Sequence, residues 1–416
     1  MKIKRTDLKY YAWVVVGLLW IVALLNYFDR LLIASMRDPI KESITMTDAQ
    51  FGLLTSVFLW VYGILSPFGG YFADRYSRKK VIVFSLLVWS GVTLWTGFVR
   101  SFPEMLIARG IMGISEACYI PAAVALITEY HKGRTRSLAT GLHISGLYAG
   151  MALGGVGGYI ADIWGWRYGF QLFGGFGIIY AAIMFLVLKD FPKDETENAD
   201  VLLQDKETTA ETKISIIGTL RNLFGTGSFW ILLFYNGTIG MSFWVIYSWL
   251  PTYLKDHFNL KLGAAGVSAT SFIQVASFLG VIAGGFLADR WSRKNIRGRL
   301  YMPVIGFTLG GPFLFLMAST SVFGVAILGM IVFGLARGFH DSNLMPIMCQ
   351  VIDKRYRATG YGFLNFFSTV IGGIMVYVGG ALKDANVSLS VVFQFSAIIL
   401  LISSWTLLAV KPKTDS

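Results

Sequence analysis

The sequence predicts an all-α membrane protein, with 12 transmembrane helices in two six-helix bundles related by a pseudo-two-fold axis. Three observations lead to this fold. Of the 416 residues, 55% are hydrophobic and only 14% are charged, whereas a soluble domain carries about 25% charged residues. The hydrophobic residues gather in windows of about 20, the length of helix that crosses about 30 Å of hydrocarbon. One loop sequence also recurs in each half of the chain, which indicates an internal duplication.

Twelve hydrophobic windows can be read, six before and six after one polar segment. The windows of the first half are about 12–36, 49–73, 81–99, 104–129, 137–161 and 168–188. Those of the second half are about 229–252, 264–288, 300–318, 323–349, 357–381 and 389–410. The segment between them is acidic and poor in aromatic residues over 189–213, which is typical of a flexible or partly helical linker. The expected parts are therefore a first bundle over 1–188, a linker over 189–227 and a second bundle over 228–416.

The Lys and Arg residues are distributed unequally between the two sides of the membrane. The formal net charge is +12, and 26 of the 36 Lys and Arg residues fall in termini and loops that share one side, against seven on the other. By the positive-inside rule, both termini and the linker face the cytoplasm. Topology accounts for the charge, so no nucleic-acid partner is expected. We expect a monomeric multi-pass protein of the plasma membrane, in particular of a bacterial inner membrane.

A repeated loop follows the second window of each half. Residues 69–80 read GGYFADRYSRKK, and residues 284–294 read GGFLADRWSRK. The aspartate of each copy would lie at a helix end, where it can interact with a neighbouring helix N-terminus and an arginine. Charges that only fixed the topology would explain the basic residues but not the repeated aspartate. The loops therefore predict four gating residues: Asp74, Arg78, Asp289 and Arg293.

Two pairs of ionisable residues lie deep within the first bundle. Asp29 and Arg30 are adjacent in the first window, and Arg109 and Glu116 are seven residues apart in the fourth. Seven residues are about two helical turns, which places both side chains on one face about 10 Å apart. Charges within a membrane face the bundle interior and mark substrate or proton pathways. Arginine suits a carboxylate in two-point geometry, and a buried carboxyl group can take up a proton near neutral pH, so the set predicts an anion site beside proton carriers.

The second bundle carries a weaker copy of this pattern in its fourth window. Asp341 precedes a proline by five residues, as Glu116 does. With the adjacent His340, it is predicted to handle protons. Asn343 is predicted to contact substrate, and the role of the nearby Arg337 is left open.

At several of these positions, a purely structural role is the alternative to a role in transport. Asp29 could pair with Arg109, and Arg30 with Glu116, merely to orient helices, although buried ion pairs are weak evidence for stability. Four charges in one bundle are costly for packing alone, which favours function. His143 could equally be a packing residue. Trp244, Tyr247 and Gln274 could line the second bundle, or serve as packing and interface residues.

The repeated loop resembles the signature of the major facilitator superfamily, Gly-x-x-Ala-Asp-Arg-x-Gly-Arg-Lys-Lys, with Ser77 and Ser292 where glycine is usual. Further matches are Arg109 to Gly113 in the fourth window and Gly165-Trp166-Arg167 before the sixth. The resemblance implies two bundles that rock around a central site. It also implies a transporter and not an enzyme, without a cofactor or a metal site.

Within the superfamily, the NYFDR sequence of the first window and the spacing of Arg109 and Glu116 resemble the anion:cation symporters. These proteins take up sugar acids and other organic anions with protons. The resemblance implies that Asp29 and Glu116 carry protons and that Arg109 tunes Glu116. With the residues discussed above, the expected substrate contacts are Tyr27, Arg30, Arg109, His143, Trp244, Tyr247, Asn343 and Asn365. The expected proton-coupling residues are Asp29, Glu116, His340 and Asp341.

We therefore expect a proton-coupled symporter that imports an organic anion, such as a hexuronate, an aldonate or a sialic acid. Its partners would be the small anion, protons and the lipid bilayer. Spinster-like lipid transporters share the charged residues of the first and fourth windows, so export of a lysolipid or sphingolipid is the second interpretation. Gly155 stands where an antiporter motif needs proline, which favours symport. A membrane-embedded enzyme is the third, but the four histidines are scattered and form no His-Glu-x-x-His motif.

Overall fold

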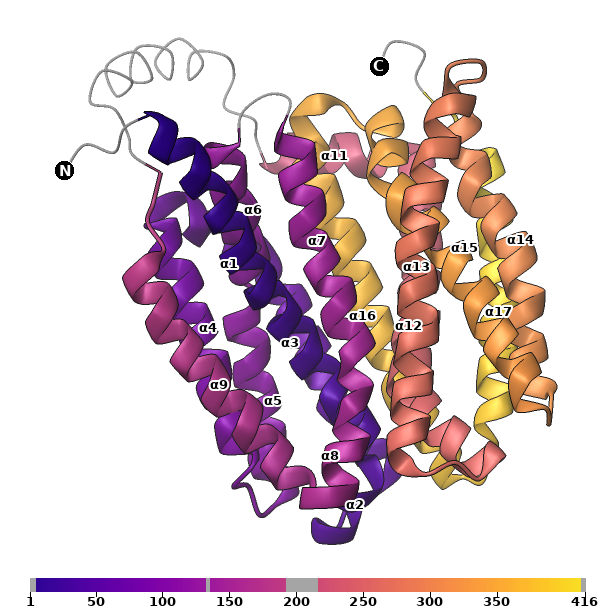
Figure 1. The fold of residues 1–416 in the computed structure, drawn as a ribbon. Coiled ribbons are helices and arrows are strands. Elements are labelled where there is room, and N and C mark those ends of the chain that lie inside the picture. Colours follow the sequence, from indigo (N-terminus) through magenta and orange to yellow (C-terminus); the bar gives the residue numbers. More distant parts are fainter. Residues whose placement is uncertain (1–4, 132–134, 192–215, 413–416) are drawn as a thin grey trace.

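The computed structural model describes residues 5–131, 135–191 and 216–412. The regular structure of these residues is entirely helical, with short loops between the helices, and strands are absent from the described ranges. Within them, 12 helical segments are long and apolar enough to cross a membrane (Figure 1). The chain is therefore a multi-pass membrane protein, as the hydrophobic windows predict.

The six spans of the first half are built from nine α-helices and two 3-10 turns. The helices are α1 (Arg5–Leu32), α2 (Arg37–Ser43), α3 (Asp48–Arg75), α4 (Arg78–Thr96), α5 (Phe102–Glu116), α6 (Tyr119–Tyr130), α7 (Arg136–Leu153), α8 (Gly157–Trp164) and α9 (Trp166–Val187). The turns are Ile33–Met36 and Gly154–Val156, which continue α1 into α2 and α7 into α8.

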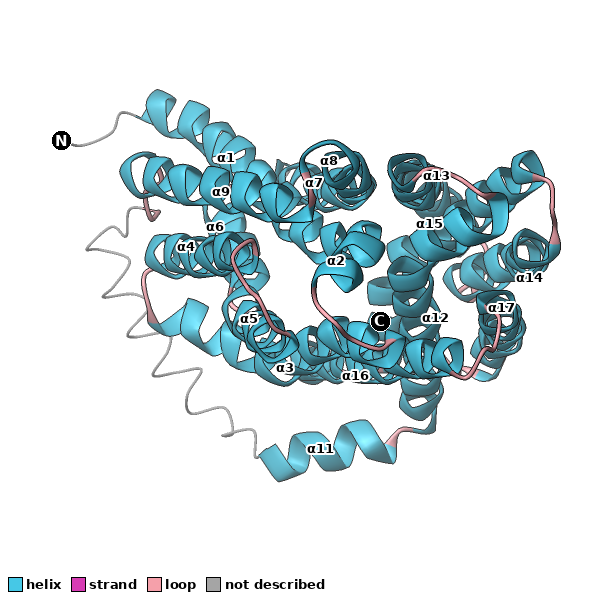
Figure 2. Ribbon diagram, turned by 90° about the horizontal axis from the view of Figure 1, so that it is seen from below, coloured by secondary structure: helices cyan, strands magenta, loops and turns pink. Residues whose placement is uncertain are grey.

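The second half is more regular, with one long helix for each span. Its helices are α12 (Gly227–Phe258), α13 (Leu262–Ser292), α14 (Gly298–Ser319), α15 (Phe323–Val351), α16 (Arg357–Asp384) and α17 (Leu389–Thr406). A short helix, α11 (Ile216–Gly225), precedes them and lies within the predicted linker (Figure 2). Residues 192–215 of that linker lie outside the described part of the chain.

Side-chain caps explain why two helices, α3 and α4, begin where they do. The Thr47 hydroxyl accepts a bond from the Gln50 backbone N–H, and Oε1 of Gln50 accepts one from the Thr47 backbone N–H. These two bonds form a capping box at the start of α3. Ser77 accepts a bond from the Lys80 backbone N–H and so caps α4. Serine is a strong N-cap and glycine a weaker one, so the serine in the repeated loop has a local structural reason.

The two halves meet along two pairs of helices, α3 with α16 and α7–α8 with α13. Figure 2 shows both pairs from one end of the bundles. We call the end that carries both termini the terminal side and the end that carries α2 the far side; these are the top and bottom of Figure 1. On the far side the halves touch backbone to backbone, since a Cβ added to Gly155 would lie 2.1 Å from the Gly266 oxygen. Small residues allow this close approach of helices, and the far side is closed.

Candidate functional site

The fourth span, expected as one helix over 104–129, is broken in two beside Glu116. Helix α5 ends at Glu116 and α6 begins at Tyr119. Pro121 explains the break, because proline lacks an N–H and its ring clashes with the carbonyl four residues earlier, here that of Ala117. The Ser85 hydroxyl donates to the carbonyl of Ser115 over 2.5 Å, which satisfies a backbone oxygen at the break. Glu116 is therefore the last residue of a half-helix that ends inside the membrane.

Arg30 and Glu116 form a buried ion pair between α1 and α5. The Nε of Arg30 donates to Oε2 of Glu116 over 2.7 Å, and the two side chains are 1% and 0% exposed. Three aromatic rings surround the guanidinium, with centroids 4.4 Å away for Tyr27, 4.5 Å for Tyr62 and 5.1 Å for Phe58. Nη2 of Arg30 and Oε1 of Glu116 have no hydrogen-bond partner among the described residues. The pair thus keeps one donor and one acceptor available.

Arg109 and Asp29 lie near this pair but do not pair with each other. Nε of Arg109 donates to the Leu54 carbonyl over 3.4 Å, and the guanidinium lies 5.1 Å from the Phe58 ring centroid. Asp29 accepts a bond from the Thr93 hydroxyl over 3.2 Å. Of the two ion pairs that the sequence suggested, only the one between Arg30 and Glu116 is formed. Arg109 can act on Glu116 only through its field and not through a direct contact.

The second bundle holds its own charged group around Arg337. Nη1 of Arg337 donates to Oε1 of Gln274 over 3.0 Å and to the Tyr247 hydroxyl. Nε of Arg337 lies 3.3 Å from Oδ2 of Asp341, one turn along α15. That same oxygen accepts a bond from the Tyr148 hydroxyl of the first half over 2.7 Å. Asp341 therefore links the charged group of the second half to α7 of the first.

Each of the two histidines predicted as site residues has a tyrosine hydroxyl within hydrogen-bonding distance. The Tyr119 hydroxyl donates to the Leu19 carbonyl over 2.8 Å and lies 2.9 Å from Nε2 of His143. Because its hydrogen goes to the carbonyl, the hydroxyl accepts from His143 Nε2, so that nitrogen carries a hydrogen. His340 has Nδ1 2.8 Å from the Tyr235 hydroxyl. His143 thus lies buried inside the first bundle, and His340 lies next to the charged group of the second.

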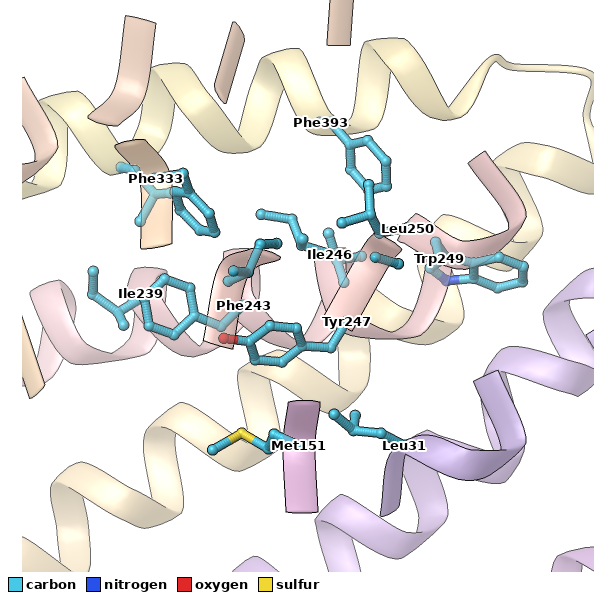
Figure 3. Packing of buried hydrophobic residues seen from close by; sticks show 14 of the residues in the cluster. Leu31, Met151, Ile239, Phe243, Ile246, Tyr247, Trp249, Leu250, Phe333 and Phe393 are labelled. Carbon is cyan, nitrogen blue, oxygen red and sulfur yellow. The ribbon is translucent and has the colours of Figure 1, made fainter. Parts of the chain in front are cut away.

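A cavity of about 80 Å³ lies between the halves at the centre of the protein. Its lining residues are Tyr27, Leu31, Met151, Gly240, Phe243, Trp244, Tyr247, Arg337 and Ser368. Figure 3 shows Leu31 and Met151 of the first half facing Tyr247 of the second. Three of the predicted substrate contacts line it, and Asn365 lies one turn from Ser368 on α16. Asn343 is instead buried within the second bundle, where its amide donates to the Phe339 carbonyl over 2.9 Å.

The profile of the Major Facilitator Superfamily matches residues 19–377 of this chain. The chain belongs to the Major Facilitator Superfamily. It is therefore a transporter and not an enzyme, and the predicted family and fold are confirmed.

Curated relatives within the superfamily match over nearly the whole chain. The probable sulfoacetate transporter SauU of Cupriavidus necator is 26% identical, over 96% of this chain and 93% of the relative. The D-galactonate transporter of Escherichia coli O6:H1 is 26% identical, over 86% of each chain. Protein spinster homolog 1 of Xenopus tropicalis is 26% identical, over 89% of this chain and 72% of the relative.

The solved structures include a close match in fold. The crystal structure of a bacterial homolog of the human lysosomal transporter Spinster, inward-facing and occupied, aligns with a TM-score of 0.79. It is 20% identical and covers 96% of this chain and 97% of that one. At this identity the match shows the fold alone.

In this superfamily member, three of the four predicted gating side chains can be placed. Arg78 forms an ion pair with the glutamate near the end of α6. Oδ1 of Asp289, in the last turn of α13, lies 2.6 Å from Nη2 of Arg299, in the first turn of α14. Arg293 is exposed and follows α13 as its C-cap. Asp74 lies on α3, but its side chain is outside the described part. The contacts of Arg78 and Asp289 stay within one half, and a gating role remains a prediction.

The far side holds a pair of contacts that sequence analysis missed. Asp384, at the end of α16, accepts bonds from the backbone N–H groups of Asp48 and Ala49 at the start of α3, each over 2.8 Å. Asp162, near the end of α8, accepts one from Gly263 at the start of α13 over 3.1 Å. Each half thus caps the second span of the other half, where a carboxylate also meets the positive end of the helix dipole. The sequence carries the signal, because GGYIAD at 157–162 matches GGALKD at 379–384.

We predict that Asp384→Asn weakens the closed far side of this transporter. Asparagine has one acceptor oxygen instead of two and carries no charge, so one of the two bonds to the start of α3 is lost. A hydrogen bond contributes about 0.5–1.5 kcal/mol, so the open state should gain roughly fivefold in population. The readout is the labelling rate of a cysteine placed at Ser56, which is buried between the halves and donates to the Gly373 carbonyl over 2.6 Å. Labelling should speed up by the same factor in a background that lacks Cys118 and Cys349.

Asp256→Asn is the matched control for this prediction. Asp256 pairs with Lys383 over 3.2 Å, and both residues belong to the second half, so this pair does not join the halves. Equal labelling rates in the Asp384→Asn and Asp256→Asn proteins would show that the cap across the halves does not hold the far side closed. Asp162→Ala should behave like Asp384→Asn, because it removes the corresponding cap.

Proposed function

We propose that this transporter is a proton-coupled symporter that imports an organic anion, in particular a sugar acid such as a hexuronate, an aldonate or a sialic acid. The observation that carries the proposal is the buried pair of Arg30 and Glu116, which lies behind Tyr27 at the central cavity. Two relatives are named as transporters of sulfoacetate and of D-galactonate, both of which are organic anions. Their shared chemistry supports an anion as the cargo.

The geometry suggests how a proton and an anion are coupled. While Glu116 is ionised, it neutralises Arg30 and competes with any anion for the guanidinium. A proton on Glu116 removes that competition, and Arg30 can then bind an acidic group of the substrate in two-point geometry. Asp29 is the second carboxyl group on this route, held by Thr93. Proton and anion are therefore bound together and released together.

Alternating access follows from the contacts between the halves. The far side is closed by the caps and by the ion pair of Asp38 with Lys255, which joins α2 to α12. With the termini in the cytoplasm, the structure is closed to the outside, and the anion leaves toward the terminal side. Opening the far side requires these contacts to break as the halves rock around the cavity.

The test is a thermal-shift screen that compares sugar acids with neutral sugars and lysolipids. One or more sugar acids should raise the melting temperature, and Arg30→Gln should weaken that binding by tenfold or more. A ligand at 100 times its Kd stabilises by about 2.7 kcal/mol, so the shift is easily measured. Arg100→Gln is the control, because Arg100 is an exposed arginine outside the cavity. Stabilisation by sugar acids that is equal in both variants would contradict the proposal.

Lipid transport, as in spinster proteins, is the second candidate. A groove of about 300 Å³ on the first bundle supports it, since its lining from α3, α4 and α5 is almost wholly apolar. The groove includes Phe72, Phe84 and Ile114 and is separate from the central cavity. This candidate predicts stabilisation by a lysolipid, with an affinity that is the same in the Arg30→Gln protein as in the unmodified one.

A further inference from the structure

Arg337 is the one charged residue in the lining of the central cavity. It is 8% exposed and comes from α15 of the second half. Nη1 of Arg337 donates hydrogen bonds to Oε1 of Gln274 and to the Tyr247 hydroxyl. Its Nε lies 3.3 Å from Oδ2 of Asp341. The third nitrogen, Nη2, meets the sulfur of Met151 at 3.9 Å. A thioether is a weak acceptor, so a strong donor points at the first half with its hydrogen-bonding capacity largely unused.

A second guanidinium lies behind the opposite side of the cavity. Tyr27 of α1 lines the cavity with Arg337, and its ring centroid is 4.4 Å from the guanidinium carbon of Arg30. Nη2 of Arg30 also has no hydrogen-bond partner among the described residues. The cavity thus lies between two buried arginines, one from each half, and each of them has a donor to offer.

Each arginine is neutralised by one carboxylate from the fourth span of its own half. Glu116 lies 2.7 Å from Arg30, and Asp341 lies 3.3 Å from Arg337. The two acids also share their position five residues before a proline in the sequence. The two acids are therefore equivalent elements of the duplicated fold, although Arg30 comes from the first span of its half and Arg337 from the fourth. In each half, a carboxylate of the fourth span neutralises a buried arginine near the cavity.

We propose that Arg337 is a second anion-binding group, and that the transported anion carries two acidic groups, one bound by Arg30 and the other by Arg337. The inference rests on the proposed function, import of an organic anion with protons, and replaces the monoacidic sugar acids named there with a dicarboxylic or similarly two-fold acidic molecule. A short molecule suits the cavity, which is far smaller than the roughly 300–1,000 Å³ of pockets for drug-sized ligands.

The charges balance when two protons accompany such a dianion. Uncompensated charge inside a membrane protein is costly. A proton on each of Glu116 and Asp341 leaves two positive arginines, which a dianion neutralises, so the loaded protein has the net charge of the empty one. Asp341 faces Arg337 and His340 on its own helix and Tyr148 on α7. A neutral Asp341 accepts less strongly from Tyr148, which loosens this bond between the halves as substrate binds.

The experiment compares acids that differ only in the second acidic group. The probes are D-galactarate against D-galactonate and succinate against butyrate, each measured by calorimetric titration of the purified full-length protein. The unmodified protein should bind at least one diacid tenfold or more tightly than its matched monoacid. Arg337→Gln should reduce that preference to less than twofold, and Arg337→Lys, which keeps the charge but not the planar fork, should give an intermediate value.

Two further variants complete the design. Lys261→Gln removes a positive charge from an exposed position outside the cavity and should keep the full preference for diacids. Asp341→Asn removes the internal competitor of the substrate and should raise diacid affinity several-fold. This second measurement does not depend on the Arg337→Gln protein folding.

The outcomes separate this inference from the function on which it rests. If a monoacid binds as tightly as its diacid and Arg30→Gln abolishes both, the second anion site is wrong while organic-anion transport stands. A diacid preference that survives in full in the Arg337→Gln protein would also overturn the inference. If no acid binds to the unmodified protein, both proposals fail.

Discussion

Replacing Gly155 with alanine is expected to abolish transport while both bundles remain folded. A Cβ at this position would lie 2.1 Å from the Gly266 carbonyl oxygen and 2.6 Å from the Thr270 hydroxyl oxygen. Both atoms belong to the second half, so the added methyl group collides only when the far side closes. One of the colliding atoms is backbone, which cannot rotate away as a side chain can. The substituted protein should therefore remain open on the far side.

Three measurements check this expectation. Uptake into proteoliposomes should fall by more than tenfold, the melting temperature in detergent should change little, and a cysteine at Ser56 should be labelled faster. Gly175→Ala is the matched control, because Gly175 lies in α9 and its added Cβ would meet nothing within 4 Å. Gly380→Ala should repeat the defect, since its Cβ would lie 2.3 Å from the Asp48 oxygen. Normal uptake by the Gly155→Ala protein would show that the close approach is not required.

The number and order of the spans could be predicted because hydrophobic length alone decides them. Each window was long enough for the bilayer, and the structure has a helix or helix pair at each. The break at Ala117 could not be predicted with the same certainty. Pro346 occupies the corresponding place in the second half, yet α15 runs through it without interruption. Whether a proline breaks or only bends a helix depends on neighbours that bond to backbone groups at that point, as Ser85 does to the Ser115 carbonyl beside the break.

The charged residues were found from sequence, but their partners were not all found. The suggested pair of Arg30 with Glu116 is formed, but Asp29 accepts from Thr93 of another helix and does not pair with Arg109 as suggested. Spacing within one helix carries no information about that choice. The same limit left the role of Arg337 open, because its place in the cavity depends on how the two halves meet.

The sequence contains a sign of the helix caps that join the two halves, because the two capping aspartates lie where a negative charge is unfavourable. Asp162 and Asp384 lie near the C-terminal ends of their helices, where the helix dipole disfavours a negative charge. A residue that opposes its local environment, and does so at equivalent places in both halves, indicates a partner elsewhere. In the structure that partner is the N-terminus of a helix in the other half.

Substituting Glu116 with glutamine is expected to abolish proton-driven accumulation while exchange of substrate continues. Glutamine has nearly the same shape, and its carbonyl oxygen can still accept the bond from Arg30 Nε that spans 2.7 Å. It cannot bind or release a proton, so the step that ties the anion to the proton gradient is lost. Breaking a buried ion pair costs about 3–5 kcal/mol because the remaining charge is uncompensated. An incoming anion supplies the missing charge, and the variant should bind it tightly.

The assay uses the acid that gives the largest thermal shift in the screen. In proteoliposomes with an alkaline interior, the Glu116→Gln protein should bring the internal concentration no higher than the external one, whereas counterflow exchange should stay within about tenfold of the unmodified rate. Glu104→Gln is the control, because Glu104 lies in the first turn of the same helix, where it accepts bonds from Ser101 and Arg100 at the far side. That variant should accumulate substrate normally. Unimpaired accumulation by the Glu116→Gln protein would remove Glu116 from the proton route, since no other change in this variant could restore a titrating group at that position.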